Sequence, residues 1–153
     1  MTAREITDRI FMGIAAFGVI ANFFPVITVQ LIYDDSVKFQ NENIMEGQYG
    51  FILMILSITT LICALLCKRI IASVMGFITA ATSAFMLFLV NDRVTTVVKW
   101  MDDPDSAFGG FIGMSGIRNI TATRAAGFYL VMAGAILLAL ISIINLIVRD
   151  KER

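Results

Sequence analysis

Histidine is absent from this sequence, so the chain lacks the side chain most often used as a general base or a transition-metal ligand. No other pattern replaces it, because the sequence has no glycine-rich phosphate loop and no Gly-x-Ser-x-Gly nucleophile motif. The four long apolar runs also carry no ionisable residue between their borders, whereas intramembrane chemistry normally requires one. We therefore expect no catalytic residue, no metal site, no cofactor and no enzymatic activity.

Cysteine is also scarce, and its placement excludes a disulfide framework. The two cysteines, Cys63 and Cys67, both lie within one apolar run, and the polar segments contain none. Palmitoylation is one role for Cys67, which lies beside basic residues at the end of that run. We favour the alternative that both are small buried apolar side chains, because free cysteine usually packs in that way.

Charged residues make up only 16% of the chain, whereas a soluble domain has about a quarter. The 12 basic and 12 acidic residues balance, and no basic patch of the kind that binds nucleic acid is present. We therefore expect no nucleic-acid partner, and the deficit of charge directs attention to the apolar runs.

Long apolar runs dominate the rest of the sequence. They span residues 10–32, 49–67, 70–90 and 125–148, each close to the ~20 residues that a membrane-spanning helix needs. The first run follows Arg4 and Arg9 but is too long for the core of a signal peptide. The sequence therefore predicts an all-α fold, an integral membrane four-helix bundle that forms one transmembrane domain over residues 1–153.

The basic residues predict how these spans are oriented. Lys68 and Arg69 lie in the very short connection between the second and third spans, and further basic residues flank the first and fourth. Because Lys and Arg accumulate on the cytoplasmic side, both termini are expected there, with a tight inner hairpin and two outer loops. We expect a multi-pass protein of the plasma membrane, specifically a bacterial cytoplasmic membrane.

Small residues predict where the helices pack. Ala72, Gly76, Ala80 and Ala84 recur every four residues, which lets another helix approach closely, and Ala15 and Gly18 do the same on the first span. An apolar helical face continues to Met101. A helix from Ile70 to Met101 would be ~48 Å long, beyond the ~30 Å hydrocarbon core, and would place Trp100 at or outside the membrane interface.

Polar residues within the spans allow two interpretations. Asn22, Ser57 and Thr60 could line a pore between protomers, or they could bond to neighbouring helices as packing contacts. We favour packing contacts, because uncharged polar residues commonly serve that role. Pro25 lacks an N–H group and is expected to kink the first helix.

The outer segments are predicted to be irregular. Tyr33–Gln48 is rich in acidic residues and reads as a solvated loop. Asp102, Asp103 and Asp105 suggest a cation site, but a solvated proline turn is the simpler interpretation. Ala107–Ile117 is rich in glycine and uncharged, and forms either a re-entrant loop or an interfacial one. Interaction with a partner is assigned to this outer region, at Trp100, Gly109, Gly110, Gly113 and Gly116.

These observations predict a non-catalytic membrane protein that acts by assembly, as a homo-oligomer or as an accessory subunit of a larger membrane complex. The alternative is an oligomeric channel. The expected partners are the lipid bilayer and a protein, which is either another subunit or a second copy. The layout resembles that of claudins and tetraspanins in topology only. The outer loops lack cysteine and the first has no Trp–Gly-Leu-Trp pattern, so no residue of either family is carried over.

Overall fold

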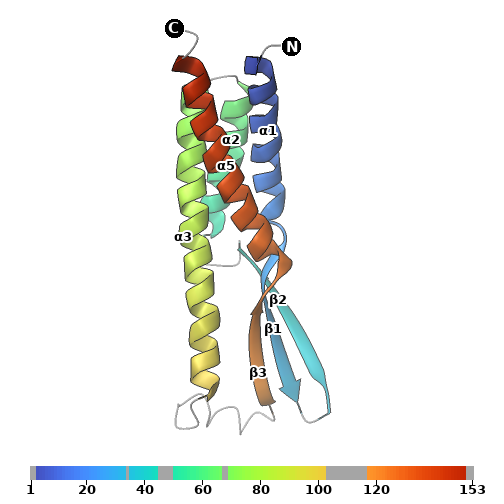
Figure 1. Ribbon diagram of the computed structural model, residues 1–153. Helices are drawn as coiled ribbons and strands as arrows, with labels where there is room; N and C mark the ends of the chain where they lie inside the picture. Colours follow the sequence, from blue (N-terminus) through green and yellow to red (C-terminus); the bar gives the residue numbers. More distant parts are fainter. Residues whose placement is uncertain (1–2, 34, 45–49, 67–68, 103–116, 151–153) are drawn as a thin grey trace.

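The computed structural model describes residues 3–33, 35–44, 50–66, 69–102 and 117–150. These residues form helices and strands in the order α1 (Ala3–Ala21), β1 (Pro25–Tyr33), β2 (Val37–Asn43), α2 (Gly50–Leu65), α3 (Arg69–Asp102), β3 (Ile117–Arg124) and α5 (Ala126–Asp150). The helices lie side by side, and the strands project from one end of them beside the second half of α3 (Figure 1). The start of α1 and the end of α5 lie at the opposite end.

The prediction of an all-α fold is wrong, because the first apolar run is half helix and half strand. Helix α1 ends at Ala21, and β1 begins at Pro25, where a helix with a kink was expected. Proline is tolerated at the first residue of a strand. The β-branched residues that follow it, Val26 to Val29, favour the extended conformation. The apolar part of α1 is thereby reduced to Ile10–Ala21, ~18 Å of helix.

The sequence predicts that the two outer segments are irregular loops, and this prediction is also wrong. Strand β2 lies within the first and β3 within the second, whereas the helix predicted to continue to Met101 does so as the end of α3. The three strands form an antiparallel sheet in the order β2-β1-β3. Gln30 in the central strand is paired with Phe39 of β2 and with Thr121 of β3. The sheet therefore joins segments that are about ninety residues apart in the sequence.

The prediction of four membrane spans is wrong as well. Among the described residues, two helices are long and apolar enough to cross a membrane, over Arg69–Lys99 in α3 and Ala126–Ile147 in α5. Helix α2 is apolar but has only 16 residues, ~24 Å against a hydrocarbon core of ~30 Å. The sequence reading had counted β1 as part of a span, which made the first apolar run appear long enough.

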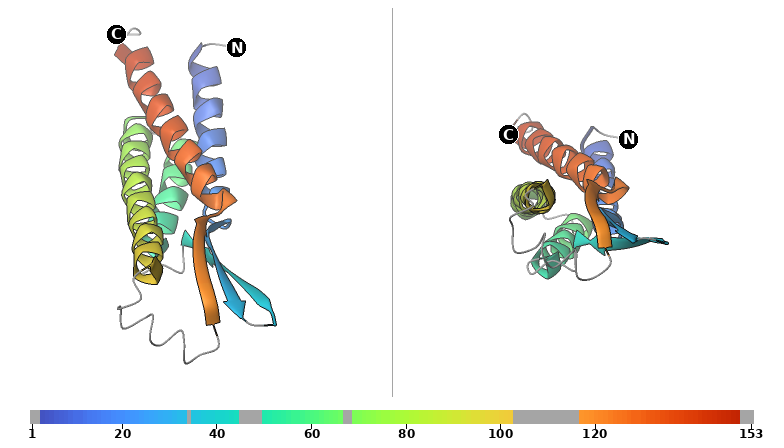
Figure 2. Two further views of the ribbon diagram at one scale, coloured as in Figure 1. Left: turned by 60° about the horizontal axis from the view of Figure 1, so that its bottom comes forward. Right: turned by 90° about the horizontal axis from the view of Figure 1, so that it is seen from below.

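Helix α3 continues well beyond its apolar part. It has 34 residues, which corresponds to ~51 Å. Its charged residues Asp92 and Arg93 mark the end of the apolar stretch. The turns beyond them run beside the sheet (Figure 2), where Val94 is buried and Val97 packs against the same cluster. One helix thus contributes to both the helical layer and the sheet layer.

Polar side chains are buried between the helices together with apolar ones, and large apolar side chains cover the outside of the helices. Nine buried side chains in the described part of the chain are polar, and all nine are Ser, Thr or Asn. The outer surfaces of the same helices expose large apolar side chains, such as Phe51, Ile78, Phe88 and Leu140. Soluble proteins rarely expose apolar surface on this scale, whereas helices in lipid do so and bury small and polar residues between them.

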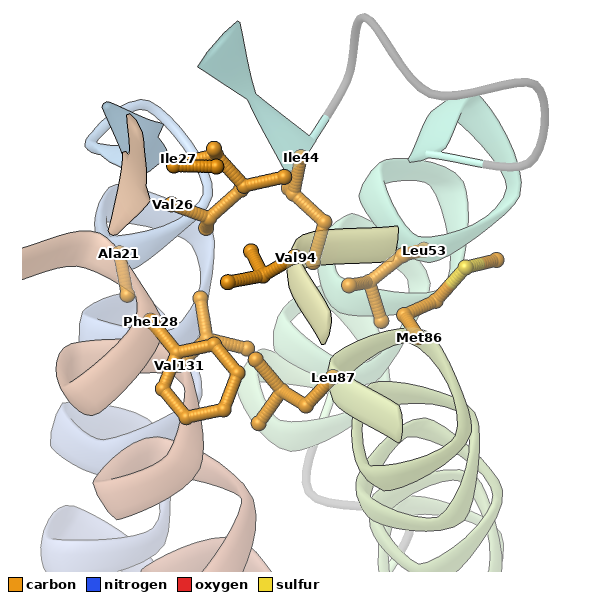
Figure 3. Close-up of a cluster of buried hydrophobic side chains, with 11 residues drawn as sticks. Ala21, Val26, Ile27, Ile44, Leu53, Met86, Leu87, Val94, Phe128 and Val131 are labelled. Atoms are coloured by element: carbon orange, nitrogen blue, oxygen red, sulfur yellow. The ribbon is translucent and has the colours of Figure 1, made fainter. Parts of the chain in front are cut away.

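Two apolar clusters hold the layers together. The larger cluster joins the sheet to the helices through Ala21, Val26, Ile27, Ile44, Leu53, Met86, Leu87, Val94, Ala122, Phe128 and Val131. Figure 3 shows these side chains converging from α1, β1, α2, α3 and α5 on one volume. The second cluster lies nearer the chain termini and is built on Phe11, Ala64, Ala72, Leu138 and Ile141.

Three of the four small residues predicted to form a packing ridge on α3 lie inside the protein. Ala72, Gly76 and Ala80 are buried, and Ala84 is exposed. A Cβ atom on Gly76 would lie 2.4 Å from Ser142 Oγ and 3.2 Å from Phe11 Cζ. The ridge therefore lies against α5 and α1 of the same protomer. On α1, Ala15 is buried.

Replacing Gly76 with leucine should destabilise the fold, since α1 and α5 already occupy the space. Overpacking of this kind costs about 1–3 kcal/mol or more. Gly13→Leu is the matched control, because a Cβ there would have nothing within 4 Å. Thermal unfolding in detergent micelles should show a lowered midpoint for Gly76→Leu alone, and equal midpoints for the two variants would contradict this packing.

Candidate functional site

The two faces of the sheet differ in chemistry, and one of them forms a cleft with α3. Val29 of β1 is paired with Ala122 of β3, Ile27 lies two residues away on the same face of β1, and all three line this cleft. The intervening residues on the other face are polar, and two contacts link them: Thr28 Oγ1 donates to Asn41 Oδ1 at 2.9 Å, and Thr121 Oγ1 donates to Gln30 Oε1 at 3.4 Å. The apolar face of the sheet is therefore directed toward α3.

The cleft between the sheet and α3, called here the sheet–helix cleft, has a volume of about 370 Å³. The apolar sheet residues form one wall, and Val94 and Val97 contribute to the wall on α3. Glu42, Asp92 and Arg93 also line it and supply charge of both signs. A cleft of this size with a few polar groups is the usual form of a site for a small amphipathic ligand or a protein side chain. Within the described ranges, no three His, Cys, Asp or Glu side chains come together as metal ligands.

Strand β2 lies at the edge of the sheet. Among the described strands it pairs with β1 alone. Its side chains are largely exposed, with Phe39 66% and Val37 48% accessible. Lys38 places its ammonium 5.5 Å from the centre of the Tyr33 ring, which orders that end of the edge. An edge strand can accept a strand from another chain, and its charged residues restrict which chains fit.

The polar residues singled out from the sequence meet inside the helical layer. Asn22, directly after α1, donates from Nδ2 to Ser57 Oγ of α2 at 3.1 Å, and the serine hydroxyl donates to Leu53 O at 2.9 Å. Thr60 of α2 and Thr79 of α3 share a hydrogen bond of 2.8 Å. The structure therefore brings Asn22, Ser57 and Thr60 into helix–helix contacts within one protomer.

A small internal cavity adjoins these contacts. Its volume is about 20 Å³, and its lining includes Gly18, Asn22, Ser57, Thr79 and Ser83. A cavity of that size holds about one water molecule with polar partners and is too small for a row of ions.

Breaking the contact between Asn22 and Ser57 should destabilise the protein by a measurable but small amount. A double-mutant cycle with Asn22→Ala and Ser57→Ala should give a coupling free energy of about 0.6 kcal/mol, the usual value for polar contacts between membrane helices. Thr59→Ala serves as the control, since Thr59 bonds only to Ile55 O of its own helix at 2.8 Å and should not couple to Asn22→Ala. Zero coupling for the first pair would show that this hydrogen bond does not form.

The residues predicted to contact a partner in the second outer segment lie mostly outside the described residues. Gly109, Gly110, Gly113 and Gly116 lie outside the described residues, as do Asp103 and Asp105. Trp100 lies in α3, and its side chain is outside the described part. The edge strand and the cleft were missed by the sequence reading. The alternation of apolar and polar residues over Ile27–Leu31 and Asn119–Thr123 is the period-2 pattern that would have indicated these strands.

No protein-family model matches the chain, and no curated protein matches its sequence.

Proposed function

We propose that this chain is a non-catalytic membrane protein that acts by assembly, with α3 and α5 crossing the plasma membrane and the sheet recognising a partner. The observation that carries the proposal is the combination of an apolar helical exterior with an exposed edge strand, β2. The first supports a location of the helices in lipid, and the second supports recognition of another chain.

The helical exterior supports the membrane location. The apolar side chains exposed along α3 and α5 have no protein partner in the described part of the chain, and water would be an unfavourable solvent for them. The segments rich in polar residues, β2 and β3, lie at one end of the molecule (Figure 1). An orientation with α3 and α5 across the bilayer satisfies both surfaces at once.

The β2 edge supports recognition of a polypeptide. Backbone hydrogen bonds along an edge provide affinity for an added strand, and side chains on alternate positions provide selectivity. Phe39 supplies a large exposed apolar side chain. Lys38 and Glu42 lie on the same strand face and carry opposite charges, so a partner strand with the reverse order of charges fits best.

The channel alternative has less support. Asn22, Ser57 and Thr60 would have to face a pore between protomers, but their side chains are buried and bonded within one protomer. Assembly through the sheet leaves these contacts intact, which is why we favour it.

Photo-crosslinking from β2 tests the proposal. Benzoylphenylalanine at Phe39 should give a discrete crosslinked species in native membranes, and mass spectrometry of that species distinguishes a second copy from another subunit. The matched control is the same substitution at Phe85, which is 56% exposed on α3 and should contact lipid only. Capture of no protein from Phe39, or the same species from both positions, would contradict recognition through the β2 edge.

A further inference from the structure

A groove lies on the helical exterior between α3 and α5, the two helices long enough to cross a membrane. Its volume is about 320 Å³. The groove exists where two short side chains, Ala84 of α3 and Ala135 of α5, line it. Its larger apolar lining residues include Phe88, Met132 and Ile136. Asn91 is its polar lining residue. Ala84 is the exposed member of the small-residue ridge on α3, so this part of the ridge is not covered by the protein itself.

A cation is fixed at the end of the groove nearest the sheet. Arg124, the last residue of β3, donates a hydrogen bond from Nη2 to Asn91 Oδ1. Its guanidinium carbon lies 5.5 Å from the centre of the Phe128 ring, another lining residue. Among the residues that the structure describes, no carboxylate lies within 4.0 Å of Arg124. Helix α5 begins at Ala126, so the positive end of its dipole adds to the charge of Arg124.

From this geometry we infer that the groove is a binding site for a glycerophospholipid with an anionic headgroup. One acyl chain lies between α3 and α5 against Ala84 and Ala135, and the phosphate is bound by Arg124. The inference rests on the membrane location in the proposed function, and it is independent of the partner at β2.

The chemistry favours a lipid over a second protein. Arg124 has no anionic partner in the described part of the chain, and guanidinium groups bind phosphate oxygens through two parallel hydrogen bonds. A groove of about 320 Å³ is at the lower limit for a ligand pocket, which fits a single hydrocarbon chain. A helix from another copy is ~10 Å across and would have to bring its own carboxylate to the level of Asn91.

The groove and the cation have separate roles. Transfer of an acyl chain from bulk lipid into the groove yields little free energy, because lipid tails are as apolar as the groove walls. Selectivity must therefore come from Arg124, and the groove must determine where the lipid is held. Loss of charge should remove the headgroup preference, and filling the groove should remove the bound lipid altogether.

Native mass spectrometry of the full chain, released from vesicles of equal parts phosphatidylglycerol and phosphatidylcholine, tests this. The wild type should retain one lipid with about a tenfold preference for phosphatidylglycerol, as expected for a charge-assisted hydrogen bond. Arg124→Gln should reduce the preference to near one. Ala84→Phe should lower retention of either lipid, and its exposed position keeps the fold intact. Arg9→Gln, at the other end of the helices, should behave as the wild type.

Two results would overturn the inference. Equal retention of the two lipids by the wild type, or the same loss of preference in Arg124→Gln and Arg9→Gln, would show non-specific attraction to the surface. Retention unchanged by Ala84→Phe would show that no lipid lies in the groove. Flotation of the vesicles separates this failure from failure of the proposed membrane location: a protein that does not float with lipid contradicts both, and one that floats without retaining lipid contradicts only the site.

Discussion

The start of α5 is the point on which the rest of the molecule depends, because the chain passes there between the helices and the sheet. Gly127 lies so close to β1 that a Cβ atom would be 2.4 Å from Pro25 O and 2.5 Å from Phe24 O. Directly before it, the Ala125 N–H donates to Val26 O at 2.9 Å. These contacts hold the connection between α1 and β1 beside the connection between β3 and α5. Only a residue without a side chain permits this approach, which places the sheet at a fixed position beside the extension of α3.

This junction connects two layers built by different physical rules. In the helical layer, small and polar residues lie between the helices beside the two apolar clusters, and large apolar side chains cover the outside. Close packing and hydrogen bonds between helices therefore contribute to stability. The ion pair between Arg69 and Asp8, at 2.7 Å, joins α3 to α1 at the far end. In the sheet layer, Ile27, Val29 and Ala122 face α3, and the polar residues between them on β1 and β3 lie on the other face. Helix α3 serves both layers, and Asn91, bonded to Arg124, lies where they meet.

The sequence was sufficient to predict α3, α5 and the ridge at Ala72–Ala80, since an uninterrupted apolar run and a four-residue period have few other interpretations. It was not sufficient for β1. The residues from Ile10 to Ile32 form one apolar run by hydropathy, and only Pro25 and the β-branched residues after it distinguish strand from helix. Polar and apolar residues alternate along β3, as is typical of a strand. Its pairing with β1 is a long-range contact that a local pattern does not specify. Asn22 lies beside Ser57 in the interior because α1 ends at Ala21, and the sequence did not predict that end.

The central claim is that the apolar exterior of α3 and α5 faces lipid while the sheet faces water. Spin labels at Ile78, at Leu140 and at Phe39, placed singly in a chain with Cys63 and Cys67 replaced by alanine, measure this directly in lipid vesicles. All three positions are exposed in the protein. The account predicts that oxygen relaxes the labels at Ile78 and Leu140 strongly and a water-soluble nickel complex does not, with the opposite result at Phe39. Strong relaxation by the nickel complex at Ile78 and Leu140 would contradict it.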